Sequence, residues 1–421
     1  MTLRVAHVTT FYPPYNFGGD GIGIQRLVRA LARRGVHNTV ILDTDAYSQL
    51  SGESPEPPPT ESNVELVRLE SNFPRLSLLA TQQLGRPVAH ATRLKELLGD
   101  NRFDVVHFHN VSLIGGPAVW SYGDSLKLDF AHEHWLVCPS HVLWRHGREL
   151  CTGRECFRCQ LNHRRPPQLW RHTSLLERHG RSIDAFVAMS EFSRAKHREF
   201  GFPFEMEVLP YFLPALAPLA PIERPNSRPY FLFVGRLERI KGLDDVIPLF
   251  REFTGADLLI AGRGEHESAL RQLAGSSEHV RFLGRVSDDE LRSLYANCSA
   301  LIVPSICYET FGIILIEAFR SGAPVLARRI GPFPEIVEAS GAGELFSTPI
   351  ELVAQLRKYA HAPELRAQFS AAGRAAFASR WSEAAVLPRY FELVGRVARR
   401  KGRGDLADAF STLALHGGLE G

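Results

Sequence analysis

The sequence predicts an α/β protein with two domains, each built on a parallel sheet. Three observations lead to this fold class. The chain has 421 residues, which exceeds the size of one ordinary hydrophobic core. Short apolar runs alternate with segments of helical periodicity, a pattern that produces parallel strands joined by right-handed crossovers. A proline-rich stretch near 213–228 separates two such series, and each series opens with strand, turn and helix.

The first series opens with a β-α-β unit whose first turn contains glycines. Residues 3–8 alternate into a strand, the loop at 12–21 contains Gly18 and Gly19, and residues 24–35 have helical spacing. The loop glycines leave two interpretations open: a turn that requires positive φ, or backbone left bare for a ligand. The further strands expected here are 38–43, 64–69, 104–109, 126–132 and 184–189, with helical stretches near 76–98 and 169–180.

The second series repeats this pattern after the linker. Apolar runs bounded by polar residues predict buried strands, and the segments between them have helical periodicity. From residue 381 the chain is expected to be helical to about 401, and residues 402–421 are expected to form a frayed tail. The expected strands are 230–234, 257–261, 280–283, 300–303 and 324–327, and the expected helices are 243–253, 266–274, 288–296 and 311–320.

The bulk composition narrows the function classes. Hydrophobic content of 44% and charged content of 23% are typical of a soluble globular protein. A net charge of +3 is too small for a chain of this length to indicate a nucleic-acid binder, although an isoelectric point of about 8.5 permits weak attraction to anionic surfaces. We find no apolar run long enough to span a membrane and no signal-peptide layout, so the six cysteines are expected to be reduced in a cytoplasm.

Two patterns in the first domain partly match known ligand-binding motifs but do not indicate those functions. Gly21 and Asp43 have the separation expected between a dinucleotide fingerprint and its ribose-binding acid, but G-x-G-x-x-G is absent, which disfavours a dehydrogenase. Asp43 and Asp45 imitate the D-x-D that holds a divalent metal in some sugar-transferring enzymes. One such tripeptide is expected by chance in a chain of this length, so a role at a strand end or turn is favoured.

The candidate active site is the strand, turn and helix at 300–320. Glu309 lies in the turn and Glu317 about two helical turns further on, so two carboxylates could line one elongated ligand. The backbone N–H groups at Phe311, Gly312 and Ile313 would point from a helix N-terminus at an anion.

Six ordered motifs recur in the second domain: Phe233-Val-Gly-Arg236 with Lys241-Gly242, Ala261-Gly-Arg-Gly264, Phe282-Leu-Gly284, Pro304-Ser305, Glu309-Thr-Phe-Gly312 and Ile316-Glu-Ala318. These motifs resemble those of retaining glycosyltransferases with the GT-B fold, in the group that includes bacterial mannosyl- and glucosyltransferases and sucrose synthases. The separation of Glu309 from Glu317 reproduces the E-x(7)-E of that group. The first domain matches more loosely, through Pro13-Pro14, Gly18-Gly19 and His132, and the resemblance covers about residues 3–385.

The resemblance implies two Rossmann-like domains facing across a cleft, with defined division points. Residues 1–212 would form the acceptor-side domain, with a cysteine-rich insert at 133–165, and residues 213–228 the linker. Residues 229–380 would bind the nucleotide sugar, the helix at 381–401 would pack back towards the first domain, and 402–421 would be the tail.

The resemblance also implies a role for each matching residue. Arg236 and Lys241 match the basic pair that holds the donor pyrophosphate, where fixed cations stabilise the charge that grows as the glycosidic bond breaks. Glu317 matches the acid on the ribose, Glu309 the acid on the donor sugar, and His132 the histidine near the anomeric carbon. The other expected donor contacts are Gly18, Gly19, Gly235, Thr310, Phe311, Gly312 and Ile313.

The expected reaction moves a hexosyl group from a nucleotide sugar to a hydroxyl of a glycan, lipid-linked or small-molecule acceptor, with retention of configuration. The group has no agreed carboxylate nucleophile, so same-face attack is expected, without a catalytic metal or other required cofactor. The enzyme would work in the cytoplasm or at the inner face of the membrane, in polysaccharide or glycoconjugate biosynthesis. The sequence leaves the nucleotide, sugar, acceptor and oligomeric state open.

Three other functions fit the sequence less well. A sugar-nucleotide 2-epimerase on the same fold would use no acceptor, but it has no claim on the Glu309–Glu317 spacing. A nucleotide-sugar-binding subunit without activity is disfavoured by the intact motif set. A zinc-dependent nucleic-acid module is weakly supported, because the cysteine spacing is not that of a known finger.

The insert contains four of the six cysteines: Cys138, Cys151, Cys156 and Cys159. In a reduced compartment, clustered cysteines with C-x-x-C spacing suit a structural zinc ion with four thiolate or imidazole ligands. The other interpretation is a loop with free or redox-labile thiols. We expect zinc here as a scaffold outside the chemistry.

Overall fold

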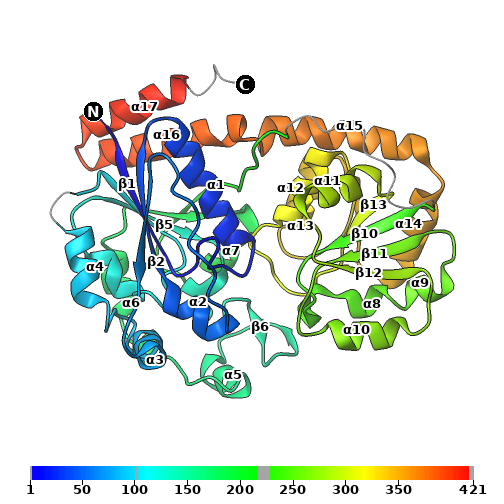
Figure 1. Cartoon of the computed structure of the whole chain (residues 1–421), viewed down its shortest axis with the longest axis horizontal. Helices are drawn as coiled ribbons and strands as arrows, with labels where there is room; N and C mark the ends of the chain where they lie inside the picture. The colour runs from blue at the N-terminus through cyan, green and yellow to red at the C-terminus, as the bar shows by residue number, and fades with distance from the viewer. Residues whose placement is uncertain (1, 100–101, 217–227, 417–421) are drawn as a thin grey trace. The chain divides into compact units, whose positions relative to one another are not determined.

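The computed structural model describes residues 2–99, 102–216 and 228–416 (Figure 1). The chain divides into two compact units, each with one large parallel sheet. The first unit comprises Met1–Phe212 and Val386–Gly421, and the second unit comprises Leu213–Ala385. Most of the expected linker, residues 217–227, lies outside the described residues.

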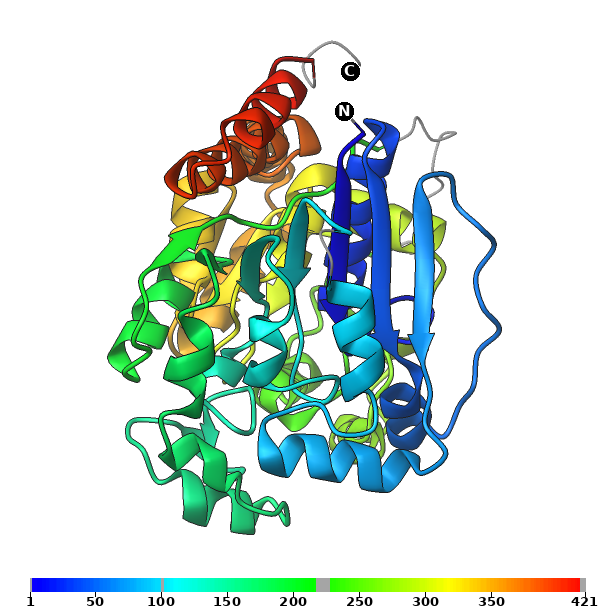
Figure 2. The same cartoon turned by 90° about the vertical axis from the view of Figure 1, so that its left-hand side faces the viewer.

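A seven-stranded parallel sheet forms the centre of the first unit (Figure 2). Its order is β3-β2-β1-β4-β5-β8-β9, so the winding of the chain reverses between β1 and β4. Strands β4 and β5 are buried along their whole length, as parallel strands covered on both faces are. The strands are β1 (Arg4–Thr9), β2 (His37–Asp43), β3 (Val64–Leu69), β4 (Val105–Phe108), β5 (Leu126–Ala131), β8 (Ala185–Ala188) and β9 (Met206–Val208).

Amphipathic helices connect these strands. Helix α1 buries Ile24, Leu27, Val28 and Leu31, the i, i+3, i+4, i+7 stripe that its sequence contains. The single helical stretch expected at 76–98 is wrong, because α3 ends at Gly85 in the left-handed conformation. The helices are α1 (Gly19–Arg33), α2 (Thr44–Ser51), α3 (Pro74–Leu84), α4 (Ala91–Leu98), η1 (Pro117–Ser121), η3 (Leu169–His172), α6 (Leu175–Gly180) and α7 (Glu191–Glu199).

The cysteine-rich insert forms a small substructure between β5 and η3. It contains η2 (His134–Leu136), an antiparallel hairpin of β6 (Trp144–Arg145) and β7 (Glu149–Leu150), and α5 (Cys156–Asn162). It has no large strand or long helix of its own. Its order therefore depends on contacts between its loops and on whether its four cysteines are cross-linked through a bound metal.

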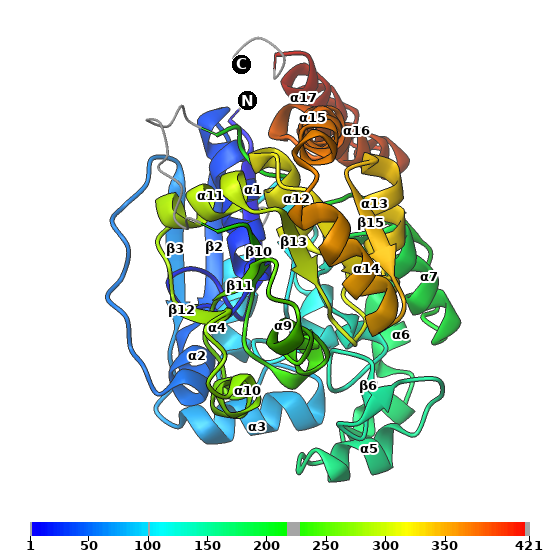
Figure 3. The ribbon, with the colours of Figure 1, turned by 90° about the vertical axis from the view of Figure 1, so that its right-hand side faces the viewer.

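A six-stranded parallel sheet forms the centre of the second unit (Figure 3). The order β12-β11-β10-β13-β14-β15 puts the reversal of winding between β10 and β13. At such a reversal, ligands of open α/β sheets bind at the carboxyl ends of the strands. The strands are β10 (Tyr230–Val234), β11 (Asp257–Ala261), β12 (Val280–Gly284), β13 (Ala300–Val303), β14 (Val325–Arg328) and β15 (Gly343–Phe346).

The helices of the second unit follow the expected alternation, with one break. The helix expected at 243–253 is two short helices on either side of Ile247 and Pro248, since proline lacks the N–H that a continuous helix needs. The helices are η4 (Arg239–Lys241), α8 (Leu243–Val246), α9 (Leu249–Glu252), α10 (Glu267–Ala274), α11 (Asp288–Asn297), α12 (Ile313–Ser321), α13 (Phe333–Ser340), α14 (Pro349–Ala360) and α15 (Pro363–Arg380).

Two helices end the described chain, α16 (Glu383–Arg400) and α17 (Gly404–His416). The tail expected at 402–421 is therefore wrong over residues 404–416, and residues 417–421 lie outside the described part. Leu406 and Phe410, one helical turn apart, are fully buried, and the Phe410 ring lies 6.2 Å from that of Phe391 in α16. This burial against α16 orders a segment whose local sequence gives little sign of it.

Candidate active site

Loops that follow β10, β11 and β13 approach one another at backbone distance. Gly235 and Gly262 have φ of 155° and 145°, and Gly242 has φ of 76°. A Cβ on Gly262 would overlap the carbonyl oxygen of Gly235, and a Cβ on Gly242 would overlap that of Pro304. Glycine alone allows both the conformation and the approach. The glycines of these motifs therefore pack the loops together at the reversal of the sheet.

Lys241 and Glu309 form an ion pair at this edge of the sheet. Lys241 Nζ lies 2.5 Å from Glu309 Oε1, and the two side chains are 21% and 26% exposed. Ser305 donates a hydrogen bond from Oγ to the same carboxylate oxygen at 3.2 Å. Burial alone would lower the pKa of Lys241 and raise that of Glu309. The pairing outweighs burial, so the pKa of Lys241 is raised, that of Glu309 is lowered, and both are charged at neutral pH.

Arg236 adds a second positive charge to this edge. Its Nη1 pairs with Glu238 Oε1 at 2.7 Å, and its side chain is 55% exposed. Its charge disfavours the charged form of Lys241 and favours that of Glu309, so all three groups act on one another electrostatically. An exposed guanidinium beside a half-buried lysine can receive a multiply charged anion.

Helix α12 begins directly after this loop. Gly312 precedes its first residue with φ of 125°, and a Cβ there would come within 3.0 Å of the Phe333 ring. Phe311 is buried, and Thr310 and Ile313 are half-buried. The first turn of α12 contains no acidic residue of its own, so its N-terminus carries the partial positive charge of the helix dipole.

Glu317 lies in the second turn of the same helix and is half-buried. Its Oε2 is 3.5 Å from the hydroxyl of the buried Tyr295. Burial, and then the charge of Glu317, raise the pKa of Tyr295, so that hydroxyl stays protonated. Glu309, Gly312 and Glu317 thus follow one another along a single loop and helix.

Gly18, Gly19 and His132 lie in the first unit. Gly18 precedes α1 and Gly19 is its first residue, where Asn16 Nδ2 donates to the Gly18 carbonyl at 2.9 Å. His132 comes directly after β5. These residues therefore lie beyond the carboxyl ends of β1 and β5 in the parallel sheet of that unit.

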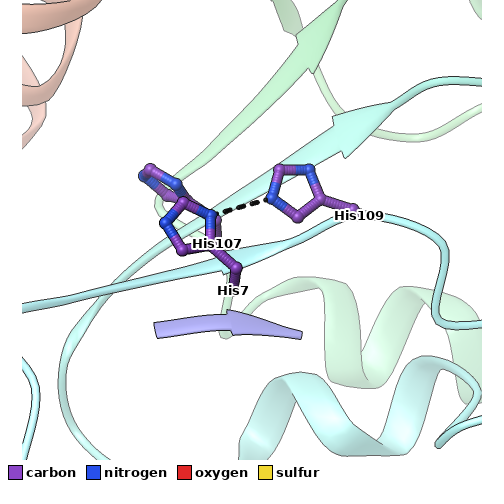
Figure 4. A group of neighbouring side chains, drawn as sticks. All are labelled: His7, His107 and His109. Atoms are coloured by element: carbon purple, nitrogen blue, oxygen red, sulfur yellow. Dashed lines mark hydrogen bonds between the residues drawn. The ribbon is translucent and has the colours of Figure 1, made fainter. Parts of the chain in front are cut away.

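His132 is the last imidazole of a hydrogen-bonded chain, part of which Figure 4 shows. His7 Nε2 lies 3.1 Å from Asn38 Oδ1, and His7 Nδ1 lies 3.2 Å from His109 Nε2. His109 Nδ1 lies 2.8 Å from His132 Nε2, and His132 Nδ1 contacts the Tyr211 hydroxyl. We call Asn38, His7, His109, His132 and Tyr211 the histidine relay.

The donor and acceptor roles in the histidine relay can be assigned in order, starting from Asn38. Asn38 Nδ2 donates to the Val36 carbonyl at 2.8 Å, so its Oδ1 accepts from His7 Nε2. His7 Nδ1 then accepts from His109, His109 accepts in the same way from His132, and His132 Nδ1 accepts from Tyr211. Burial lowers the pKa of His7 to about 4 and that of His132 to about 3, so the neutral forms persist. Both ring nitrogens of His132 are engaged within the relay.

Several of these partners were missed by sequence reasoning. His107 and His109 are two residues apart in a predicted strand and so share one face, which is the only signal that could have suggested a histidine cluster. Nothing in the local sequence connects His7, Asn38 or Tyr211 with His132, because each comes from a different strand or loop. Ser305 was seen only as a motif residue.

No helix among the described residues combines the length and apolar content needed to cross a lipid bilayer.

Comparison with known proteins assigns the class. The family model described as "Glycosyl transferase 4-like domain" matches residues 18–211, and that described as "Glycosyl transferases group 1" matches residues 220–376. The chain belongs to the group 1 glycosyltransferases and is a transferase enzyme, as its motifs predicted. A curated relative, the "Uncharacterized 42.6 kDa protein in cps region" of Klebsiella pneumoniae, is 25% identical over 79% of this chain and 87% of its own length.

Solved structures agree with this assignment at the level of the fold. Sucrose-phosphate synthase from Thermosynechococcus elongatus superposes with a TM-score of 0.73 at 18% identity, over 94% of this chain and 100% of that one. Anabaena Alr3699/HepE, solved in complex with UDP-glucose, gives 0.63 at 15% identity, over 97% and 100%. The expected GT-B fold is confirmed.

Proposed function

We propose that this enzyme is a retaining glycosyltransferase that moves a hexosyl group from a nucleotide sugar to an acceptor hydroxyl. One observation carries the proposal: the Lys241–Glu309 ion pair stands at the reversal of the second sheet, directly before the N-terminus of α12. Cations and helix N–H groups suit a diphosphate, and a carboxylate suits sugar hydroxyls. Alr3699/HepE, a structural relative, is described with UDP-glucose bound.

Donor binding would divide the Lys241–Glu309 pair between two parts of one ligand. The diphosphate would compete with Glu309 for Lys241 and would also engage Arg236 and the α12 N-terminus. The freed Glu309 carboxylate would accept hydrogen bonds from the donor sugar, and Glu317 from the ribose. Gly18, Gly19 and Gly235 would offer backbone that a ligand can approach closely.

The chemistry would be same-face substitution. As the bond from the anomeric carbon to the phosphate oxygen breaks, negative charge grows on the leaving diphosphate, and Lys241 and Arg236 stabilise it. The acceptor oxygen forms the new bond on the same face, and its proton passes to the departing phosphate oxygen. This scheme uses cationic side chains where some transferases use a metal, so transfer should persist in EDTA.

His132 would take part only at the expense of its present contacts. Both its nitrogens are engaged in the histidine relay, so contact with the sugar through Nδ1 requires the Tyr211 hydroxyl to turn away. We propose that the relay holds the His132 ring in position near the anomeric carbon.

We propose an acceptor that is a glycan, a lipid-linked sugar or a small molecule of polysaccharide or glycoconjugate biosynthesis. The relative in the cps region of Klebsiella pneumoniae supports this class of pathway. The six free cysteines fit a reducing compartment, and a lipid-linked acceptor would bring the enzyme to the inner membrane face.

A thermal-shift panel of nucleotide sugars tests the donor class. Ligand binding raises the melting temperature according to affinity, so one nucleotide with one sugar should give the largest shift. Product analysis with that donor should then show transfer with the anomeric configuration of the donor. An inverted product would overturn the mechanism, and no shift with any nucleotide sugar would overturn the donor assignment.

A further inference from the structure

The four cysteines of the insert line one small cavity. Cys138 follows η2, Cys151 follows β7, and Cys156 and Cys159 lie one turn apart on the same face of α5. All four are free thiols. Pro139, Ser140 and Trp144 also line this cavity. The fold thus brings together side chains that the sequence spreads over 22 positions.

The β6–β7 hairpin makes backbone hydrogen bonds that involve two of these cysteines. At the open end of the β6–β7 hairpin, Cys151 N donates a hydrogen bond to the Leu143 carbonyl at 2.8 Å. At the other end of the hairpin, His146 N lies 3.3 Å from Cys159 Sγ and donates to it. Cys151 and Cys159, at the two ends of the hairpin, thus line the same cavity.

A positive charge stands beside this cluster. Arg171 lines a neighbouring cavity of about 490 Å³ together with Cys156. Its guanidinium stacks 4.6 Å from the Trp170 ring and 5.1 Å from that of Trp135, and its buried Nη2 has no hydrogen-bond partner in the described part of the chain. Four thiolates around a divalent ion carry a net charge of −2, which a buried guanidinium would partly offset.

Two groups of side chains within the described residues have ligand atoms close enough together to share a metal ion: His7, His107 and His109, and Asp43, Asp45 and His90. In the first group, His7 and His109 are hydrogen-bonded to each other (Figure 4). The three imidazoles also have hydrogen-bond partners in Asn38, Tyr390 and His132. Asp43 of the second group caps α2. The cysteine quartet is not among these groups, so a bound ion would have to draw its sulfur atoms inwards.

We propose that Cys138, Cys151, Cys156 and Cys159 bind one structural Zn²⁺. Four sulfur ligands about 2.3 Å from the ion form the closed tetrahedral site that holds small, loop-rich substructures together. The insert has little core of its own, so the ion would supply the cross-link between η2, the hairpin and α5. The ion is scaffold, and the inference stands independently of the proposed transfer reaction.

Metal analysis of the full chain tests this proposal. Protein purified without chelator from zinc-supplemented medium should contain about one zinc per chain. The Cys156→Ser/Cys159→Ser double variant should lose most of it, while Cys298→Ser, which changes a buried cysteine in the second unit, should keep it. Wild-type protein with a small fraction of one zinc, or a double variant with the wild-type amount, overturns the proposal.

Two further measurements keep the result decisive if the double variant folds poorly. Cobalt-loaded wild-type protein should show the intense visible absorption of a tetrahedral thiolate site, and zinc should abolish it by displacement. Thiol titration of the denatured, chelated protein should find all six cysteines reduced. Two thiols would indicate disulfides in the insert and would contradict a zinc site.

Discussion

Lys241 Nζ and Glu309 Oε1 are 2.5 Å apart although 68 positions separate them in the chain. One comes from the turn after β10 and the other from the loop after β13, and these neighbouring strands define the reversal of the second sheet. The relationship matters because it joins a cation suited to phosphate with a carboxylate suited to sugar hydroxyls. It leads to the first prediction.

Substitutions of this pair should separate binding from turnover. Lys241→Met should weaken nucleoside diphosphate binding by roughly 10- to 100-fold, because a charged hydrogen bond is lost. Glu309→Gln should leave that binding unchanged or tighter, since Lys241 loses its competing partner, yet should lower turnover by about 10²–10³-fold. Calorimetric titration and initial rates measure the two effects.

The Lys358–Glu344 pair provides a matched control. It has the same 2.5 Å separation and lies in the same unit, but its lysine is 49% exposed and it lies away from the β10–β13 edge. Lys358→Met should change neither binding nor rate. Equal losses in the control and in Lys241→Met would mean that the site assignment is wrong.

Replacing a loop glycine with alanine should destabilise the fold more where the added Cβ meets neighbouring atoms than where it meets none. Gly242→Ala should cost about 1–3 kcal/mol more in unfolding free energy than Gly341→Ala, because its Cβ meets the Pro304 carbonyl. Gly341 also has positive φ, at 57°, but a Cβ added there would meet nothing within 4 Å, so backbone strain is its only cost. Denaturant unfolding of both variants makes the comparison, and equal losses would show that the close loop packing contributes nothing.

Five buried histidines, three of them in the histidine relay, should make the enzyme less stable in acid. Burial lowers the pKa of His7 and His197 to about 4 and that of His132 to about 3, and it lowers those of His107 and His109 well below their ordinary value. Below pH 6.5 these histidines are therefore protonated in the unfolded chain but remain neutral in the folded chain. Each histidine then costs about 1.4 kcal/mol per pH unit as the pH falls from 6.5 towards 4.

Buried carboxyl groups act in the opposite direction. Burial raises the pKa of Asp43 to about 7 and that of Asp129 well above its ordinary value, so their protonation in the folded chain adds stability in the same window. Because only these two carboxyl groups add stability while five histidines reduce it, the histidines determine the sign of the net change. Urea unfolding at pH 7 and pH 5 should show a net loss of stability at pH 5, whereas equal or greater stability there would contradict the assignment of these histidines as buried and neutral.

Helix α17 should contribute to folding. Phe410→Ala should reduce the free energy of unfolding by about 3–5 kcal/mol, because a fully buried ring is removed. Leu415→Ala on the same helix should have little effect, since Leu415 is 78% exposed. A neutral Phe410→Ala variant would mean that residues 404–416 behave as the tail that the sequence suggested.

Much of the fold could be predicted because the buried strands of a parallel sheet appear in the sequence as short runs of apolar residues. Runs such as Ala300–Val303 match β13 residue for residue. The breaks at Gly85 and Pro248 lay in the sequence, but each had to be weighed against strong helical periodicity on both sides. Helix α17 escaped because its order comes from burial against α16, a contact between distant segments.

The candidate site was predictable to a different depth in each unit. The motif glycines and the Lys241–Glu309 pair follow strands, and carboxyl ends of neighbouring parallel strands meet at one edge. The relay could not be foreseen, because hydrogen bonds between His7, His109, His132 and Tyr211 depend on side-chain directions from four separate segments. It also changes the view of His132, whose nitrogens are already engaged.

Release of nucleoside diphosphate in the presence of acceptor tests the central claim most directly. Purified enzyme supplied with UDP-, GDP- and ADP-sugars and a glycan acceptor pool should turn over at least one donor in EDTA. Glu309→Gln should abolish most of that release, and Glu344→Gln should leave it unchanged. Release that is absent with every donor, or equal in Glu309→Gln and wild type, would contradict the account.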